Sequence, residues 1–164
     1  MSASRRPVYF NPSARSWTAP SPTSTDLLAS FHQQLPGYQR TRLIKLDEIA
    51  KEIGVRNVFL KDESSRFGLP SFKILGASWG TFRALARELN LPLDSDIATI
   101  KRALASRQIT LYAATDGNHG RAVARMGSIW SLPVEIHVPS CTDIATIELI
   151  RAEGAYGSRF NKLC

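Results

Sequence analysis

The chain contains little cysteine and no long apolar run, and each absence narrows the class of protein. Only two of its 164 residues are cysteines, with no CxxC pair and no cluster of histidines. We therefore expect neither a disulfide framework nor a metal site, and a reducing compartment suits this composition. No stretch approaches the roughly 18–20 consecutive apolar residues that a membrane span needs, so we expect no membrane partner.

The N-terminal segment lacks the apolar core of a secretory signal, which favours a cytoplasmic protein. Residues 1–17 carry arginines and serines without an acid, a composition also typical of mitochondrial transit peptides. Pro7 and Pro12, however, interrupt any amphipathic helix there. Prolines, serines and threonines are concentrated in residues 1–25. We predict that residues 1–25 form a disordered arm without a core of its own.

The basic charge of the chain does not by itself indicate a partner. A formal net charge of +7 and a sequence pI near 9.8 suit an anionic ligand. The lysines and arginines are scattered, however, and no RNP-like, KH-like or zinc-finger spacing is present. We expect a solvated basic surface and no nucleic-acid partner. At 43% hydrophobic residues, the chain has material for one domain core.

The hydrophobic periodicity switches along the chain between helical and alternating segments, which is typical of an α/β protein. One-face apolar spacing predicts helices at 26–35, 46–54, 72–89, 96–105, 121–131 and 142–155. Alternating or β-branched runs predict strands at 55–63, 109–115 and 134–139. The order of strand, loop, helix and strand after residue 109 predicts a parallel βαβ sheet, with DGNHG as a tight loop.

The segment TDGNHG, residues 115–120, follows the first strand of that βαβ unit. In open α/β sheets, ligands bind beyond the carboxyl ends of strands, next to helix amides that point outward unpaired. Gly117, Asn118 and Gly120 tolerate the left-handed backbone that wraps N–H groups around an anion. We expect a carboxylate or phosphate here. The alternative is a plain turn in which Asp116 caps the helix.

Lys73 is a second candidate because LPSFKILGASWG, residues 69–80, surrounds it with apolar and small residues. An apolar site near a helix N-terminus favours the neutral amine, which is the form that attacks an aldehyde. The small residues Gly76, Ala77 and Ser78 would let a flat ring approach. The alternative is a lysine whose stem lies on apolar surface while its ammonium reaches water.

The two segments together are more specific than either alone. KDESSRFGLPSFKILGA followed by ATDGNHGRAVA resembles the pyridoxal-phosphate enzymes of the tryptophan-synthase-β type, known as fold-type II, which include serine and threonine dehydratases. Within that superfamily, KDES-RFG, the aspartate of TDGNHGR and the upstream FH---PGY--T-L are most similar to the diaminopropionate ammonia-lyase family. The resemblance covers about residues 28–155.

The resemblance implies a role for each matching residue. Lys73 would bind the aldehyde of pyridoxal phosphate covalently, and the side-chain amide of Asn118 would donate to the phenolic oxygen of the ring. The backbone amides of Thr115, Gly117, Asn118 and His119 would hold the carboxylate of a small amino-acid substrate. The implied reaction is α,β-elimination of 2,3-diaminopropionate, which yields pyruvate and ammonia.

Asp116 separates the possible activities within the superfamily. Common dehydratases have a small neutral residue at this position, whereas in the ammonia-lyase the aspartate is implicated as a base for the D-isomer of the substrate. A carboxylate repels the substrate carboxylate, so its presence makes sense mainly if a proton must be moved. Two alternatives stay open: a serine/threonine dehydratase of the same fold, and a non-catalytic fragment that pairs with a longer relative through exposed sheet edges.

The resemblance also implies a protein longer than 164 residues, because the phosphate-cradling glycine loop and the later strands of the large domain have no counterpart here. We interpret residues 26–155 as the N-terminal part of a pyridoxal-phosphate domain, with a parallel-sheet βαβ small domain and an incomplete large domain. After Gly154 a strand is expected, yet strand formers are few, so 156–164 are interpreted as an atypical tail. We expect the short chain to be inactive alone and the complete protein to be a homodimer.

Overall fold

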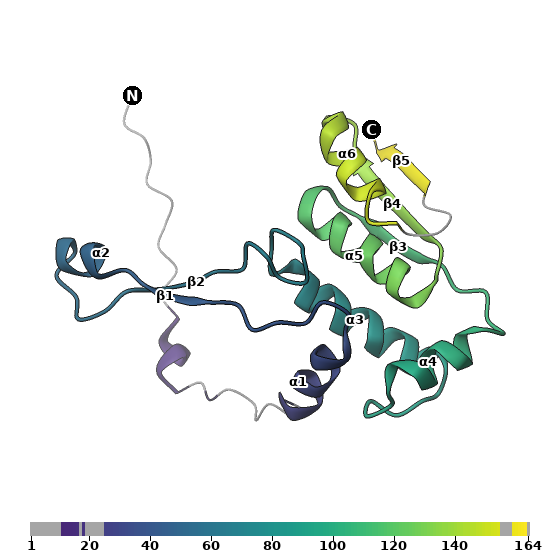
Figure 1. Ribbon diagram of the computed structural model, residues 1–164, viewed down its shortest axis with the longest axis horizontal. Helices are drawn as coiled ribbons and strands as arrows, with labels where there is room; N and C mark the ends of the chain where they lie inside the picture. The colour runs from purple at the N-terminus through teal and green to yellow at the C-terminus, as the bar shows by residue number, and fades with distance from the viewer. Residues whose placement is uncertain (1–10, 17, 19–24, 155–158, 164) are drawn as a thin grey trace.

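The computed structural model describes residues 11–16, 18, 25–154 and 159–163, and it combines a small sheet with packed helices and a projecting hairpin (Figure 1). The helices are η1 (Pro12–Arg15), α1 (Thr25–Gln34), α2 (Asp47–Glu52), α3 (Lys73–Glu88), α4 (Ile97–Leu104), α5 (Gly117–Trp130) and α6 (Ile144–Arg151). The strands are β1 (Leu43–Lys45), β2 (Phe59–Lys61), β3 (Leu111–Ala114), β4 (Val134–Pro139) and β5 (Arg159–Leu163). The predicted α/β class is confirmed.

The strands β3, β4 and β5 form a parallel sheet in that order. Leu111 pairs with Val134, and Ala114 pairs with His137. Helix α5 connects β3 to β4 and helix α6 connects β4 to β5, because parallel neighbours need a crossover and cannot be joined by a tight turn. The prediction of a parallel βαβ sheet is therefore confirmed.

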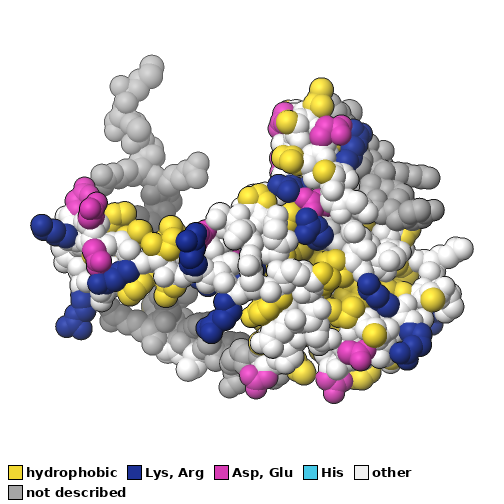
Figure 2. Space-filling view, in the orientation of Figure 1, with side chains coloured by type: hydrophobic (Ala, Val, Ile, Leu, Met, Phe, Trp, Pro, Cys, Tyr) yellow, Lys and Arg dark blue, Asp and Glu magenta, His cyan; other side chains and the backbone are white. Residues whose placement is uncertain are grey.

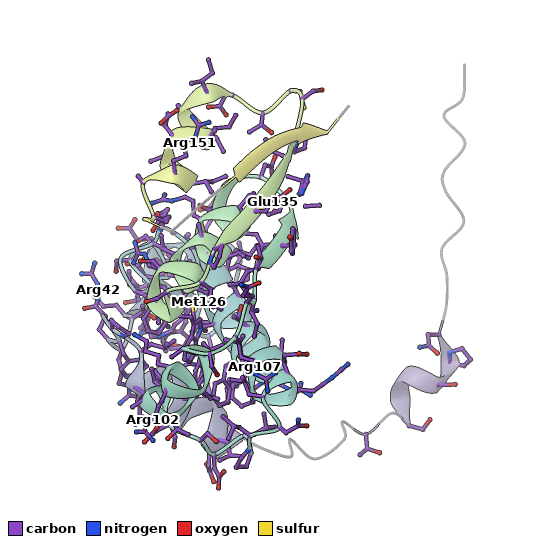
Figure 3. All side chains as sticks on the ribbon, turned by 90° about the vertical axis from the view of Figure 1, so that its right-hand side faces the viewer. Arg42, Arg102, Arg107, Met126, Glu135 and Arg151 are labelled. Carbon is purple, nitrogen blue, oxygen red and sulfur yellow. The ribbon has the colours of Figure 1, made fainter. Side chains whose placement is uncertain are left out.

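The core lies where helix α5 packs between the sheet and helix α3. Helix α5 contacts β3, β4, α3 and α6, and Figure 3 shows Met126 of this helix inside the molecule. The inward side chains of β4, Val134, Ile136 and Val138, are fully buried. Each such side chain contributes roughly 1.5–3 kcal/mol when it leaves water. The alternation predicted for β4 therefore directs one face of the strand into the core.

The strands β1 and β2 form an antiparallel hairpin that carries α2 in its connection and projects to the left in Figure 1. The sequence predicted a strand over 55–63, but the strand β2 covers only Phe59–Lys61, with one further backbone hydrogen bond between the arms at each end, at Val58 and Asp62. Its partner, Leu43–Lys45, was not predicted as a strand. In a two-stranded sheet each strand can pair only with the other, so the shortness of β1 limits the length of β2. Phe59 and Leu60 are exposed, and Figure 2 shows hydrophobic side chains gathered on this arm.

Helix α5 begins inside the segment that was predicted to be a loop. Asp116 stands at the N-cap and Gly117 is already the first helical residue, so the prediction of a separate DGNHG loop is wrong. Helix α6 begins as its sequence suggests, because the Asp143 carboxylate accepts the amide of Thr146 at 2.8 Å. Gly154, with φ of +74°, follows its end as a left-handed stop.

The terminal segments were predicted as an arm and an atypical tail. Residues 1–10, 17 and 19–24 of the arm, and 155–158 and 164 near the other end, lie outside the described residues. Contrary to the expectation from strand propensity, Arg159–Leu163 do form a strand, parallel to β4. Pairing with a buried neighbour overrides weak intrinsic propensity. Within the described part of the chain, no helix is long and apolar enough to cross a membrane.

Candidate functional site

The two predicted site segments lie at the starts of two neighbouring helices. Helix α3 begins at Lys73 and helix α5 begins at Gly117. The two helices pack against each other, and in Figure 1 their N-terminal ends face the same side of the molecule. The fold thus presents the Lys73 amine and the amides that follow Thr115 on one side, at the carboxyl end of β3.

Lys73 is exposed, so the expectation of an apolar enclosure is wrong for this chain. The reason is helical spacing, because the inward positions of the first turns belong to Ile74, which is 1% exposed, and to Ala77 and Ser78. The Lys73 Nζ lies 5.3 Å from the centre of the Phe72 ring, a cation–π distance. The amine is therefore open to an incoming aldehyde.

Space for a flat group exists beside this amine. A Cβ placed on Gly76, one turn further along α3, would meet no other atom within 4 Å. The amide of Lys73 donates to the Ser71 hydroxyl at 3.2 Å, which anchors the preceding turn. Of the three small residues predicted to let a ring approach, only Gly76 is exposed. Ala77 and Ser78 are buried and cannot line such a site.

The segment from Thr115 to Gly120 has the geometry of an anion-binding helix start. The amide of Thr115 donates to the carbonyl of His137 at 2.8 Å, which extends the β3–β4 ladder. Gly117 then adopts a φ of +52°. The amide of Gly120 donates to the Asp116 carbonyl at 3.4 Å. The amides of residues 117–119 precede this first helical bond, so helix geometry leaves them without intrahelical acceptors.

Asp116 does not act as the side-chain cap that a plain turn predicts. It occupies the N-cap position with extended φ and ψ of −121° and −178°, but its side chain makes no capping hydrogen bond. Asp116, Asn118 and His119 are all exposed. The carboxylate and the Asn118 amide are therefore not committed to holding the helix. His137 lies on β4, as predicted, and its Nε2 is 2.9 Å from Glu135 Oε1.

Gly120 fixes helix α5 against its neighbours. A Cβ at this position would lie 2.9 Å from Ile150 Cδ1 and 3.6 Å from Ile136 Cγ2. Both isoleucines are buried. Only glycine allows this approach of α5 to α6 and β4 without rearrangement, so Gly120 serves packing. The left-handed backbone expected for Gly117, Asn118 and Gly120 is found at Gly117 alone, because Asn118 and Gly120 are helical residues of α5.

A charge cluster that the sequence interpretation missed links α5 to the segment before Lys73. The Glu153 side chain is 3% exposed and accepts from Arg121 Nε and Arg125 Nε, each at 2.8 Å. Arg125 also donates from Nη1 to the Phe67 carbonyl at 3.0 Å. The i, i+4 spacing of the two arginines on one helix was the available signal. This cluster positions the chain that leads to Lys73.

A second ion pair holds the same segment from the side of the hairpin. Arg66 donates to both carboxylate oxygens of Glu63 at 2.6 Å, and to the Gln39 carbonyl at 3.1 Å. The Thr41 hydroxyl donates to Glu63 at 2.7 Å. The Arg66 guanidinium, opposed by partial burial, lowers the pKa of Glu63 below its ordinary value. The segment between the hairpin and α3 is thus built on charge-assisted bonds.

His32 of α1 supports the first turns of α3, a role that the sequence motif around it does not reveal. Its Nε2 lies 3.1 Å from the Leu75 carbonyl and 3.1 Å from the Ser78 hydroxyl. Burial lowers the pKa of His32, the bond to Leu75 opposes that change, and the Arg66 charge adds to it. Its ring stands between α1 and α3, so His32 is a packing and positioning residue.

The donors present fit a cofactor that has an aldehyde and a substrate that has a carboxylate. An accessible primary amine suits the aldehyde, and a helix start with free amides and a positive-φ glycine suits the carboxylate. Among the described residues no group of three or more His, Cys, Asp or Glu is arranged to hold a metal ion. The α/β fold, the accessible amine and the free amides together fit the class of enzymes that bind an aldehyde cofactor and a substrate with a carboxylate.

A family model described as "Pyridoxal-phosphate dependent enzyme" matches residues 34–159, and the chain belongs to this family. It is similar to diaminopropionate ammonia-lyase of Escherichia coli strain K12, with 33% identity over 136 residues, 82% of this chain and 34% of the relative. The resemblance inferred from the motifs is confirmed, and so are the implied cofactor family and the partial fold-type II architecture.

Solved structures of the E. coli enzyme superimpose on this chain. The complex with D-serine gives a TM-score of 0.75 at 31% identity, covering 84% of this chain and 35% of that one. The complex with an aminoacrylate-PLP azomethine reaction intermediate gives 0.70 at 30% identity, covering 84% and 33%. The chain spans about a third of the length of the curated relatives it matches.

Proposed function

We propose that the protein acts in a pyridoxal-phosphate-dependent α,β-elimination that converts 2,3-diaminopropionate to pyruvate and ammonia. The observation that carries this proposal is the position of Lys73 and of the amides at 117–119 at the starts of the adjacent helices α3 and α5. The similarity to diaminopropionate ammonia-lyase supports the substrate class.

In this proposal the cofactor and the substrate engage different groups. The Lys73 amine is the covalent attachment point, and the side-chain amide of Asn118 donates to the phenolic oxygen of the ring. The amides of Gly117, Asn118 and His119 hold the substrate carboxylate, helped by about half a positive charge at the helix start. The Thr115 amide, which was also expected to bind the carboxylate, donates to the His137 carbonyl instead. Bound pyridoxal phosphate would supply an electron sink for the carbon next to that carboxylate.

Asp116 is the proposed base for the D-isomer of the substrate. Its carboxylate is exposed and makes no capping bond, so it is available to accept a proton at the substrate α-carbon. The E. coli relative has been solved with D-serine, which supports a site that admits D-amino acids. The reaction then needs one hydrolysis, and both nitrogens of the substrate leave as ammonia.

The test is a product assay on the 164-residue chain and on the longest product of the same gene. Each is supplied with pyridoxal phosphate and with D-2,3-diaminopropionate, L-2,3-diaminopropionate or L-threonine. The proposal predicts pyruvate from diaminopropionate with the longer product, and little turnover by the short chain, as the sequence led us to expect. Preference for threonine would favour a dehydratase instead. No turnover, together with co-purification of a longer relative, would favour a non-catalytic partner.

The role of Asp116 is tested in the active product by Asp116→Asn, with Asp94→Asn as the matched control at another exposed acid. We expect Asp116→Asn to slow the D-isomer at least tenfold more than the L-isomer, because general-base catalysis contributes about 10²–10⁴-fold. Equal losses for both isomers would contradict the role. Assembly of the complete protein as a homodimer and a cytoplasmic location are part of the same proposal.

A further inference from the structure

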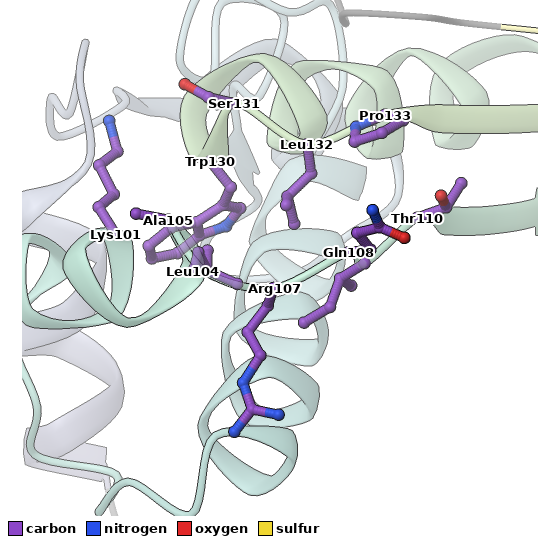
Figure 4. Close-up of a pocket in the computed structure, with 11 residues that line it drawn as sticks. Lys101, Leu104, Ala105, Arg107, Gln108, Thr110, Trp130, Ser131, Leu132 and Pro133 are labelled. Atoms are coloured by element: carbon purple, nitrogen blue, oxygen red, sulfur yellow. The ribbon is translucent and has the colours of Figure 1, made fainter.

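A hollow lies at the opposite end of the strands from Lys73 and the 115–120 segment. Its volume is about 740 Å³, within the range of about 300–1,000 Å³ typical of small-molecule sites. It is formed where α4 ends, where β3 and β4 begin and where α5 ends, and Figure 4 shows its walls. No role was predicted for any of these residues.

The floor of this hollow is apolar and contains an unpaired donor. Trp130 and Leu132 are 2% and 4% exposed, and Leu104 is also buried. Figure 4 shows the indole ring of Trp130 close to Leu104, with Leu132 beside them. The Trp130 Nε1 is buried without a hydrogen-bond partner among the described residues. Buried donors in native proteins are paired with a protein group, a ligand or an ordered water, so the Trp130 Nε1 can accept a polar partner.

The rim of the hollow is basic. Lys101 and Arg107 line it and are exposed, and neither has an acidic partner within the described part of the chain. No Asp or Glu occurs in residues 97–115 or 117–133. The ends of α4 and α5 together bring roughly one negative charge in partial dipoles. Two full cations exceed that, so the rim attracts an anion.

We propose that this hollow binds a small organic anion that has a flat or apolar body. The body lies on Trp130, Leu104 and Leu132, and the anionic group pairs with Lys101 and Arg107 at the rim. A polar atom of the body accepts from the indole Nε1 after a small side-chain adjustment. The site is at the amino ends of the strands, so it does not depend on the function proposed for Lys73.

The probe is 3-phenylpropionate, with the neutral 3-phenylpropionamide as its matched partner. Binding to the 164-residue chain is followed by the indole N–H signals in NMR, among which the Trp130 signal is the one removed by Trp130→Phe. The proposal predicts a saturable shift of that signal with the carboxylate, and about tenfold weaker binding of the amide, because a charge-assisted bond is lost.

The double variant Lys101→Gln/Arg107→Gln tests the rim, and Arg102→Gln is its control because Arg102 is a cation of the same helix end that does not line the hollow. We expect the double variant to weaken binding of the carboxylate about tenfold and the control to change it less than twofold. Equal binding of acid and amide, or equal losses in both variants, would overturn the proposal. So would the absence of any saturable shift of the Trp130 signal.

Discussion

Arg125 donates a guanidinium N–H to the backbone carbonyl of Phe67 at 3.0 Å, and so ties the middle of α5 to the segment that leads to Lys73. Phe67 has a φ of +52°, a left-handed conformation that is costly for a bulky residue. Because the same arginine is held by the buried carboxylate of Glu153, the turn that follows α6 takes part in fixing the position of the lysine.

Glu153→Gln should destabilise the chain by about 2 kcal/mol. Removing one partner of a fully buried ion pair costs about 3–5 kcal/mol, but Arg121 and Arg125 are partly exposed and can be hydrated. Urea unfolding followed by circular dichroism measures the difference. The matched control is Glu148→Gln, which breaks the exposed pair with Arg151 and should change stability by less than about 0.5 kcal/mol. Equal effects of the two substitutions would contradict the proposed importance of the cluster.

Gly120→Ala should cost about 1–2 kcal/mol, because the new methyl would lie 2.9 Å from Ile150 Cδ1 in a packed interior. Adding Ile150→Val removes that methyl, so the double variant should lose less stability than the sum of the two single variants. Gly80→Ala is the control, since its Cβ would meet nothing within 4 Å and helix propensity predicts a gain of up to about 1 kcal/mol. If the double variant loses as much stability as the two single variants together, the contact with Ile150 Cδ1 is not the cause of the loss in Gly120→Ala.

The stability of the chain should fall on acidification in a manner that depends on His32. Burial lowers the pKa of His32, so the folded state favours the neutral ring while the unfolded state takes up the proton first. The stabilisation that the lowered pKa of His32 gives to the folded state is therefore complete above about pH 6.5 and is lost as the pH falls below that value. Glu63 also has a lowered pKa, but the stabilisation that it gives is lost only at more acidic pH, below about pH 4.5.

The measurement is the free energy of unfolding in urea between about pH 5 and pH 8, where His32 changes charge and ordinary carboxylates do not. His32→Gln should be less stable at neutral pH and should show a shallower loss of stability on acidification. If both proteins lose stability with the same slope, the burial of a neutral His32 is not the cause of the pH dependence.

The sequence predicted the elements that local patterns specify. The apolar spacing of α3 and the alternation of β4 are visible in short windows, and the structure has them at the predicted places. The start of α5 was missed because Asp116 and Gly117 favour turns and also favour helix starts. The strand β1 was missed because three residues are too few for a period to be recognised.

The residues that hold the candidate site in place do so through contacts between distant parts of the chain, which no local sequence pattern reveals. Arg125 and Phe67 are 58 residues apart in sequence, and Arg125 and Glu153 are 28 apart. Composition around Lys73 suggested an apolar enclosure, yet helix geometry places Ile74 inward and leaves the lysine exposed. The motifs therefore indicated which residues to examine as a site, while the fold was needed to determine their orientation and what holds them.

The role of Lys73 can be tested by adding pyridoxal phosphate to the purified chain, reducing with borohydride, and mapping the label by mass spectrometry of peptides. We predict one label per chain at Lys73, lost in Lys73→Arg and kept in Lys51→Arg, an exposed lysine on α2. Label spread over many lysines, or the same label in both variants, would contradict the assignment of Lys73 as the cofactor-binding residue of this chain.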